Sequence, residues 1–126
     1  MEKKIVVTDK APAAIGPYSQ AVEIGGFVFA SGQIPIDPAT GNIPDGIEAQ
    51  ARQALTNVAN LLEAAHLKMS DVVKTSVFIK NMDDFAKVNE IYATFFEGDY
   101  PARSCVEVAR LPKDVLIEVE VIAARR

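Results

Sequence analysis

Two stretches of the chain repeat their apolar residues every three or four positions, which is the spacing of one face of an α-helix. The first begins at about Ile47, and its apolar positions are Ala51, Ala54, Leu55, Val58, Leu61, Leu62 and Ala65. We expect its polar positions to face solvent, namely Gln50, Arg52, Gln53, Asn57 and Glu63. The second begins at Asp83 and Asp84, which can cap a helix, and stops at Gly98. Its inward positions are Phe85, Val88, Ile91, Tyr92, Phe95 and Phe96.

Short runs of strand-like composition occupy residues 5–7, 19–24, 27–31 and 72–79. Gly25 and Gly26 join the second and third runs, and because glycine accepts a positive φ, this pair predicts a two-residue hairpin. The fourth run alternates and places Val73, Thr75, Val77 and Ile79 on one face. Residues 32–46 hold three prolines and three glycines, which predicts a surface loop that edges a cleft.

The C-terminal region reads as a strand, a turn and a second strand. In the first strand Ser104, Val106 and Val108 alternate with Arg103, Cys105 and Glu107. In the second, Ile117, Val119, Val121 and Ala123 alternate with Glu118 and Glu120. The residues at 111–114 suit a turn that folds one strand onto the other, and directly opposed residues then point the same way. This pairing predicts one shared face for Arg103, Cys105, Glu107, Glu118 and Glu120.

That polar face has two interpretations from the residues alone. In one, Arg103 and Glu120 form a cross-strand ion pair in water, which is an ordinary surface feature. In the other, Arg103 lies in a cleft and its guanidinium binds an anion, while a nearby carboxylate handles water. The periodicity fits both.

The order of the elements predicts an α+β sandwich with both helices on one face of the sheet. Strands come first, two helices follow with one strand between them, and a strand pair ends the chain. The chain has 126 residues and a mass of 13.6 kDa, so we expect one domain over residues 1–126. Such a chain is small for an enzyme that encloses its own site. A site shared between subunits is therefore expected.

Charge and composition exclude several classes of function. The net charge of −4 and the pI of about 5.0 give no electrostatic reason to bind nucleic acid. The sequence shows no Cys or His cluster at metal-ligand spacing and no Gly-rich phosphate loop. No apolar run approaches membrane-spanning length, and the N-terminus turns polar too early for a signal peptide, so we expect a cytoplasmic protein.

Four blocks of sequence resemble the RidA/YjgF family of reactive-intermediate deaminases, in family order. They are APAAIGPYSQ at residues 11–20, SGQIP at 31–35, VN at 88–89 and PARSCVEVARLPKD at 101–114, the last followed by IEV at 117–119. The resemblance therefore runs along the whole chain. It implies a chorismate-mutase-like α+β fold with a mixed sheet, assembled as a homotrimer with sites in the clefts between subunits.

The resemblance also implies a reaction, the hydrolysis of 2-imino acids such as 2-iminobutanoate and 2-iminopropanoate to 2-oxo acids and ammonia. Arg103 would bind the substrate carboxylate, and Glu118, with Glu120 as the alternative, would orient the water. The resemblance further implies that Cys105 borders the substrate and that Tyr18 closes the pocket from a neighbouring subunit. Ser31 and Asn89 would be secondary lining residues. No cofactor or metal is required, because a protonated imine is already electrophilic.

Two other functions on the same scaffold stay open. The first is a regulator that binds a carboxylate metabolite through Arg103 without turnover. The second is an RNA-cleaving or translation-inhibiting protein, which would need a basic groove with stacking aromatic residues. The acidic balance and the absence of tryptophan count against the second.

Overall fold

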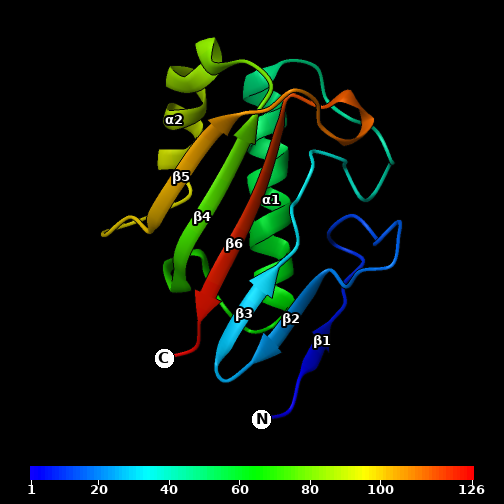
Figure 1. Cartoon of the computed structure of the whole chain (residues 1–126), viewed down its shortest axis with the longest axis vertical. Helices are drawn as coiled ribbons and strands as arrows, with labels where there is room; N and C mark the ends of the chain where they lie inside the picture. The colour runs from blue at the N-terminus through cyan, green and yellow to red at the C-terminus, as the bar shows by residue number, and fades with distance from the viewer.

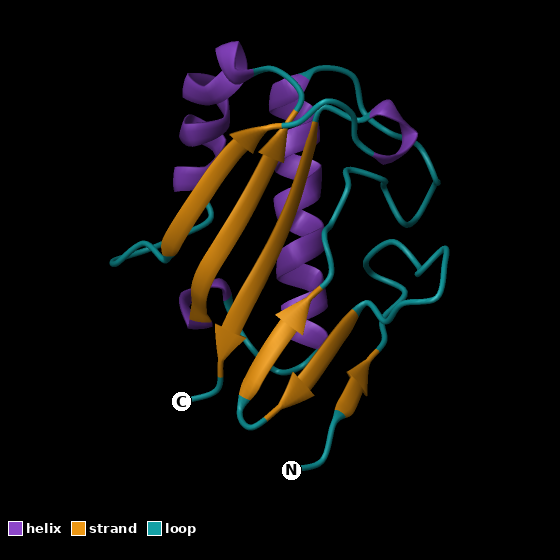
Figure 2. Cartoon of the chain, viewed as in Figure 1, coloured by secondary structure: helices purple, strands orange, loops and turns teal.

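Six strands form one mixed sheet in the order β1-β2-β3-β6-β4-β5 in a computed structural model that describes residues 1–126. The strands are β1 (Lys4–Val6), β2 (Ala21–Ile24), β3 (Phe27–Ala30), β4 (Val72–Ile79), β5 (Ala102–Glu107) and β6 (Ile117–Ala124). The helices are α1 (Ile47–Ala64) and α2 (Phe85–Ala93), with short 3₁₀ turns η1 (Met69–Asp71), η2 (Met82–Asp84) and η3 (Pro112–Asp114). Both helices cover the same face of the sheet (Figures 1 and 2), which confirms the predicted α+β arrangement.

The predicted hairpin is confirmed between β2 and β3. Gly25 and Gly26 have φ values of 59° and 84°, and Ile24 pairs with Phe27 across the turn. Both glycines therefore use backbone conformations that residues with a Cβ rarely adopt. The first strand runs from Lys4 to Val6, one residue earlier than predicted.

The predicted pairing of the last two strands is wrong. β4 lies between β5 and β6 (Figure 1), parallel to β5 and antiparallel to β6. Arg103 is in register with Thr75, which is fully buried under the helices, so Arg103 and Cys105 point toward the helix-covered face. Glu118 lies opposite Phe78 on the other face of the sheet. The shared face is thus divided: Arg103, Cys105 and Glu107 are on one side, and Glu118 and Glu120 on the other.

The reason for the error is the position of β5 at the edge of the sheet. The alternation of apolar residues predicts that Val106 faces the core, but Val106 is 46% exposed on the uncovered face. The half-buried side of the strand instead belongs to Cys105 and to Arg103, whose long stem packs beneath α2. Glu107 lies at the end of the strand, where its Oε1 accepts a hydrogen bond of 2.8 Å from the Met82 N–H.

The apolar stripe of α1 is confirmed, but two of its polar positions are not at the surface. Asn57 is fully buried, and its amide donates hydrogen bonds of 3.0 and 2.9 Å to the carbonyls of Ile34 and Ile36. Gln50 is also buried and connects α1 to the carbonyl of Pro44 and the N–H of Leu116. The helix therefore holds residues 32–46 in place through side-chain amides.

Replacing Asn57 by alanine is expected to lower the free energy of unfolding by about 2–3 kcal/mol, because two buried carbonyls lose their donors. Urea denaturation measures the change. The matched control is Asn60→Ala on the same helix, whose amide bonds the Lys10 carbonyl in an exposed position and which should lose much less. Equal losses of unfolding free energy in the two variants would contradict the stabilising role of the buried Asn57 hydrogen bonds.

The second helix is shorter than predicted. It ends at Ala93, so Phe95 and Phe96 follow it rather than belong to it, and Gly98 lies beyond its end with φ 77°. At the start, Asn81 Oδ1 accepts the Asp83 N–H at 2.9 Å, whereas the side chain of Asp84 makes no capping bond. Val73 also departs from the prediction, because a register shift between Val72 and Lys74 turns it outward to 45% exposure.

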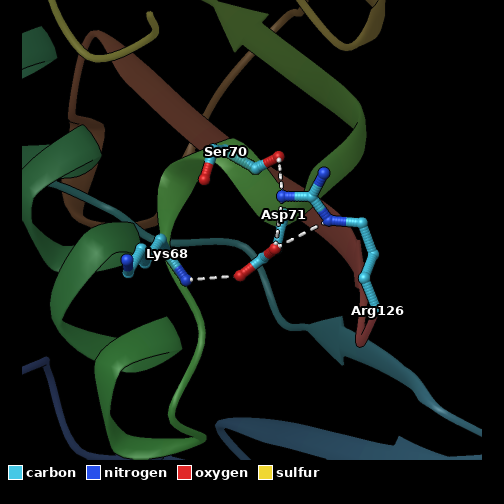
Figure 3. A network of polar contacts seen from close by, with 4 residues as sticks. All are labelled: Lys68, Ser70, Asp71 and Arg126. Atoms are coloured by element: carbon cyan, nitrogen blue, oxygen red, sulfur yellow. Dashed lines mark hydrogen bonds and ion pairs between the residues drawn. The ribbon is translucent and has the colours of Figure 1, made fainter.

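The C-terminus is attached to the turn between α1 and β4 (Figure 3). The Arg126 guanidinium donates to Asp71 Oδ1 at 3.0 Å, and the Lys68 N–H donates to the other carboxylate oxygen at 2.9 Å. These two contacts, led by the Lys68 N–H, hold the pKa of Asp71 below its usual value. They fix the end of β6, the strand that carries Glu118.

One face of the sheet has no cover. Strand pairing places Ile5, Phe27, Phe29 and Val106 on it, with exposed fractions between 44% and 51%. Phe27 and Phe29 contact one another, with ring centres 6.4 Å apart. No helix is long and apolar enough to span a bilayer.

Candidate functional site

Arg103 is held against α2 by one hydrogen bond and by contacts with two aromatic rings. Its Nη1 donates a hydrogen bond of 2.8 Å to Asn89 Oδ1. Its guanidinium carbon lies 4.9 Å from the ring centre of Tyr92 and 5.4 Å from that of Phe85. Arg103 takes part in no ion pair, so of the two interpretations of the polar face the ion pair with Glu120 is wrong. Its other N–H groups make no hydrogen bond within the chain.

A cavity of about 360 Å³ opens beside this guanidinium. It is lined by Asn89, Tyr92, Ala93, Tyr100, Pro101 and Arg103. Aromatic and aliphatic surface makes up most of the wall, and the guanidinium supplies the positive charge. This composition suits a small anion with an apolar part. Tyr100 is 60% exposed at the rim, where its ring meets Phe96 edge-on.

Cys105 lies two residues beyond Arg103 on the same face of β5 and is half-buried. Burial raises the pKa of its thiol, and the charge of Arg103 only partly opposes that effect. The thiol is therefore protonated at neutral pH and makes no hydrogen bond to a base. This environment fits a residue packed against the core and does not fit a nucleophile, and Cys105 is not among the residues that line the cavity beside Arg103.

Glu118 lies on the uncovered face, packed against Gly32. Burial raises the pKa of its carboxyl above the usual value, and the charge of Glu120 raises it further. Glu120 itself is exposed and lies with Lys74 and Ser76 at a cavity of about 190 Å³. Of the two candidate carboxylates, Glu118 has the environment that tunes an acid or base.

Glycine at position 32 is required by this packing. A Cβ there would lie 2.7 Å from the carboxyl carbon of Glu118 and would collide with Oε2. We expect Gly32→Ala to displace the carboxylate and to lower kcat by about tenfold or more for any reaction in which Glu118 moves a proton, since small misplacements of such a group are costly. Gly41→Ala is the control for local strain, because no atom lies within 4 Å of a Cβ there but its φ of 79° disfavours alanine, so it should cost stability and leave kcat unchanged. Steady-state kinetics distinguishes the two. An unchanged kcat in Gly32→Ala would contradict the role of Glu118.

Ser31 adjoins Gly32, the residue packed against Glu118, and Tyr18 adjoins Ser19, which Ser31 bonds. The Ser31 hydroxyl donates to the Ser19 carbonyl at 2.7 Å, next to Tyr18 in the chain. Tyr18 is 49% exposed, and its hydroxyl accepts from the Ile15 N–H at 3.4 Å. Neither residue lines the cavity beside Arg103.

The predicted site residues thus fall into two groups within one chain. Arg103, Asn89 and Cys105 lie together between β5 and α2, whereas Glu118, Ser31 and Tyr18 lie around the other face of the sheet. Strand β4 separates the two groups. The chain has no group of three His, Cys, Asp or Glu side chains arranged to hold a metal ion.

Sequence reasoning missed the residues that hold Arg103. The periodicity predicts that Phe85 and Tyr92 belong to the apolar stripe of α2, and the family resemblance implies a site role for Asn89 alone. These three positions are four and three residues apart, so they share one face of the helix. That spacing is a signal which could have identified all three from the sequence.

Comparison with known proteins gives a match over the whole chain. The family profile described as endoribonuclease L-PSP matches residues 8–125. A Salmonella typhimurium protein named 2-iminobutanoate/2-iminopropanoate deaminase is 58% identical over 126 residues, 98% of each chain, and an Escherichia coli protein of the same name is 57% identical with the same coverage. The crystal structure of Escherichia coli TdcF with bound serine superposes with a TM-score of 0.95 at 52% identity, covering 98% of this chain and 99% of that one.

Proposed function

Since the chain belongs to the endoribonuclease L-PSP family, the RidA/YjgF family that its motifs indicate, we propose that it hydrolyses 2-imino acids to 2-oxo acids and ammonia. The chain is a 2-iminobutanoate/2-iminopropanoate deaminase, as its relatives at 57–58% identity are named. The observation that carries this proposal is Arg103, an arginine without an acidic partner beside a small, largely apolar cavity.

The free N–H groups of Arg103 bind the substrate carboxylate. A guanidinium presents parallel donors that match the two carboxylate oxygens in spacing and charge. The short apolar side chain of the imino acid then contacts the wall formed by Tyr92, Ala93 and Pro101. This arrangement fixes the orientation of the imine carbon relative to the carboxylate.

Water attacks the imine carbon, and the π electrons of the C=N bond move to nitrogen. Glu118, as carboxylate, accepts a proton from the attacking water and returns one to the nitrogen of the resulting carbinolamine. The C–N bond then breaks, ammonia leaves with the bonding electron pair, and the hydroxyl proton passes to the Glu118 carboxylate as the carbonyl forms. Cys105 borders the substrate beside Arg103, and Tyr18 and Ser31 lie on the side of Glu118.

Arg103 and Glu118 point to opposite faces of one sheet, so they must come from two different copies of the chain to act on one substrate. The copies contact one another through the uncovered face with Phe27 and Phe29. Two different patches then meet at each contact, and such heterologous contacts close into rings. We therefore propose a homotrimer with one site at each interface.

A coupled assay tests the activity. A threonine dehydratase generates 2-iminobutanoate in situ, and release of 2-oxobutanoate is followed with and without the protein. The proposal predicts that the protein accelerates release. A carboxylate-binding regulator would bind 2-oxobutanoate without accelerating its release, and an RNA-cleaving protein would degrade RNA while leaving the imine rate unchanged.

The instability of the substrate suggests where the protein works. Imino acids hydrolyse spontaneously, so a catalyst is useful only in the compartment where they form. We place the protein in the cytoplasm, together with the dehydratases that release such imines. Fractionation of cells with an antibody against the chain would test this location.

A further inference from the structure

The groups that hold Arg103 are all electrically neutral. They are the amide oxygen of Asn89 and the aromatic rings of Phe85 and Tyr92. The three ion pairs of the chain involve Arg110, Arg125 and Arg126, each with a carboxylate, and none involves Arg103. Arg103 is therefore the half-buried arginine of this chain whose charge no carboxylate compensates.

The cradle has a rigid support behind it. The hydroxyls of Tyr92 and Thr75 share a hydrogen bond of 2.8 Å in the buried interior. Thr75 lies on β4 in register with Arg103 on β5, so the sheet that positions the arginine also positions the ring it rests on. Tyr92 further packs on Phe96, with ring centres 4.8 Å apart. The ring plane under the guanidinium is thus fixed from two sides.

We infer that Phe85, Asn89 and Tyr92, supported by Thr75, form a neutral cradle that positions the Arg103 guanidinium while leaving its whole charge available to the substrate carboxylate. Asn89 is accordingly a positioning residue as well as part of the cavity lining. The inference rests on the proposed function only for the identity of the ligand, a short monocarboxylate. It deepens that proposal, because it states what makes this arginine selective for an anion.

Asparagine at position 89 gives this inference its most specific prediction. An aspartate there would be nearly isosteric and would also accept the Nη1–H bond, so it would hold the side chain equally well. It would also compensate the guanidinium charge and attract the N–H groups that the ligand needs. The cradle therefore predicts that aspartate preserves the fold and impairs ligand binding.

The test measures equilibrium binding of 2-oxobutanoate and of its neutral amide, 2-oxobutanamide, by calorimetry. For the wild type, we expect the carboxylate to bind more tightly than the amide. Asn89→Asp should weaken carboxylate binding by about tenfold or more, leave amide binding nearly unchanged and leave Tm equal or higher. Asn89→Ala should weaken carboxylate binding by only about two- to fivefold, because the guanidinium keeps its charge and loses one hydrogen bond.

The support behind the ring is tested by Tyr92→Phe and Thr75→Val. Each should weaken carboxylate binding by about two- to fivefold, and the double variant should lose no more than the worse single one, because both remove the same hydrogen bond. Val58→Ala on α1 is the stability control, since it creates a buried defect away from Arg103. It should lower Tm without changing the dissociation constant.

Three results would overturn the inference. They are equal affinities of the wild type for the carboxylate and its amide, undiminished carboxylate binding by Asn89→Asp, and losses of affinity that follow Tm across all variants. Because no turnover is measured, the cradle can fail while the deaminase activity holds. Conversely, the cradle can hold in a protein that binds carboxylates without hydrolysing imines.

Discussion

Replacement of Arg103 by alanine is expected to lower kcat/KM for 2-iminobutanoate by about a hundredfold or more, while the protein stays folded. The reason is the loss of a charged, bidentate contact to the substrate carboxylate, which is worth about 3 kcal/mol in a desolvated site. The coupled dehydratase assay measures the rate, and a sizing column with a thermal melt measures assembly and folding. Arg103→Lys should recover part of the activity, because it keeps the charge and loses the planar fork.

The matched control is Arg110→Ala. Arg110 is an exposed arginine paired with Asp114 at 2.8 Å, and it lies in neither group of site residues. Its replacement should leave kcat/KM unchanged. If Arg103→Ala retained full activity, or if it lost assembly without a specific loss of rate, the anion-binding role would be wrong and Arg103 would be a structural residue.

Replacement of Glu118 by glutamine is expected to lower kcat by about a hundredfold or more, with little change in the affinity for 2-oxobutanoate. A glutamine keeps the shape and packing against Gly32 but cannot accept a proton from water. Single-turnover kinetics gives the chemical rate, and calorimetry gives product affinity. Glu120→Gln is the control, because Glu120 is exposed and is expected to affect kcat only slightly. Similar losses in both variants would contradict the assignment to Glu118.

The same substitution has a predictable effect on stability. The pKa of Glu118 is raised in the folded protein, chiefly by burial, so the folded state holds this proton more tightly than the unfolded chain. The contribution of Glu118 to stability is therefore present at acidic pH and is lost as pH rises from the unfolded pKa through the raised folded one. Glu118→Gln should then be more stable than the wild type at neutral pH and should lose that advantage in acid.

Catalysis requires the opposite protonation state. Only the ionised carboxylate of Glu118 can accept a proton, so kcat should fall as pH decreases through its raised pKa. The ionised form of Glu118 is therefore the form that catalysis needs and also the form that lowers the stability of the fold. Catalytic groups often show this combination. The pH–rate profile of Glu120→Gln should shift to lower pH, since the charge of Glu120 contributes to the raised pKa of Glu118.

The sequence predicted the elements whose pattern is local. The repeat from Ala51 to Ala65 identified α1, and the paired glycines identified the β2–β3 hairpin, because both depend only on neighbouring residues. Buried amides could not be predicted in the same way. Asn57 has the polarity of a surface residue, and only the nearby carbonyls of Ile34 and Ile36, 21 to 23 residues earlier, explain its burial.

The chemistry of the site could be predicted better than its geometry. The motif around Arg103 indicated the residues, but the relative placement of Arg103 and Glu118 depends on which strand lies between β5 and β6. Sequence neighbours pair often, but here β4 is inserted and β5 becomes an edge strand. Its apolar Val106 faces outward at this edge, so Arg103 lies on the helix-covered face. This arrangement supports the proposal that Arg103 and Glu118 reach one substrate from two different chains, in a site between subunits as the family resemblance implies.

Complementation between two inactive variants tests this conclusion most directly. The Arg103→Ala and Glu118→Gln proteins are mixed in equal amounts, unfolded and refolded together. The mixture is then assayed for imine hydrolysis. Suppose that each site takes Arg103 from one subunit and Glu118 from its neighbour. Half of the subunits then carry an intact Arg103 and the other half an intact Glu118, so about a quarter of the sites receive both residues and about a quarter of the wild-type activity returns. If the mixture is no more active than the two parents, the residues do not act across an interface and the account of the site is wrong.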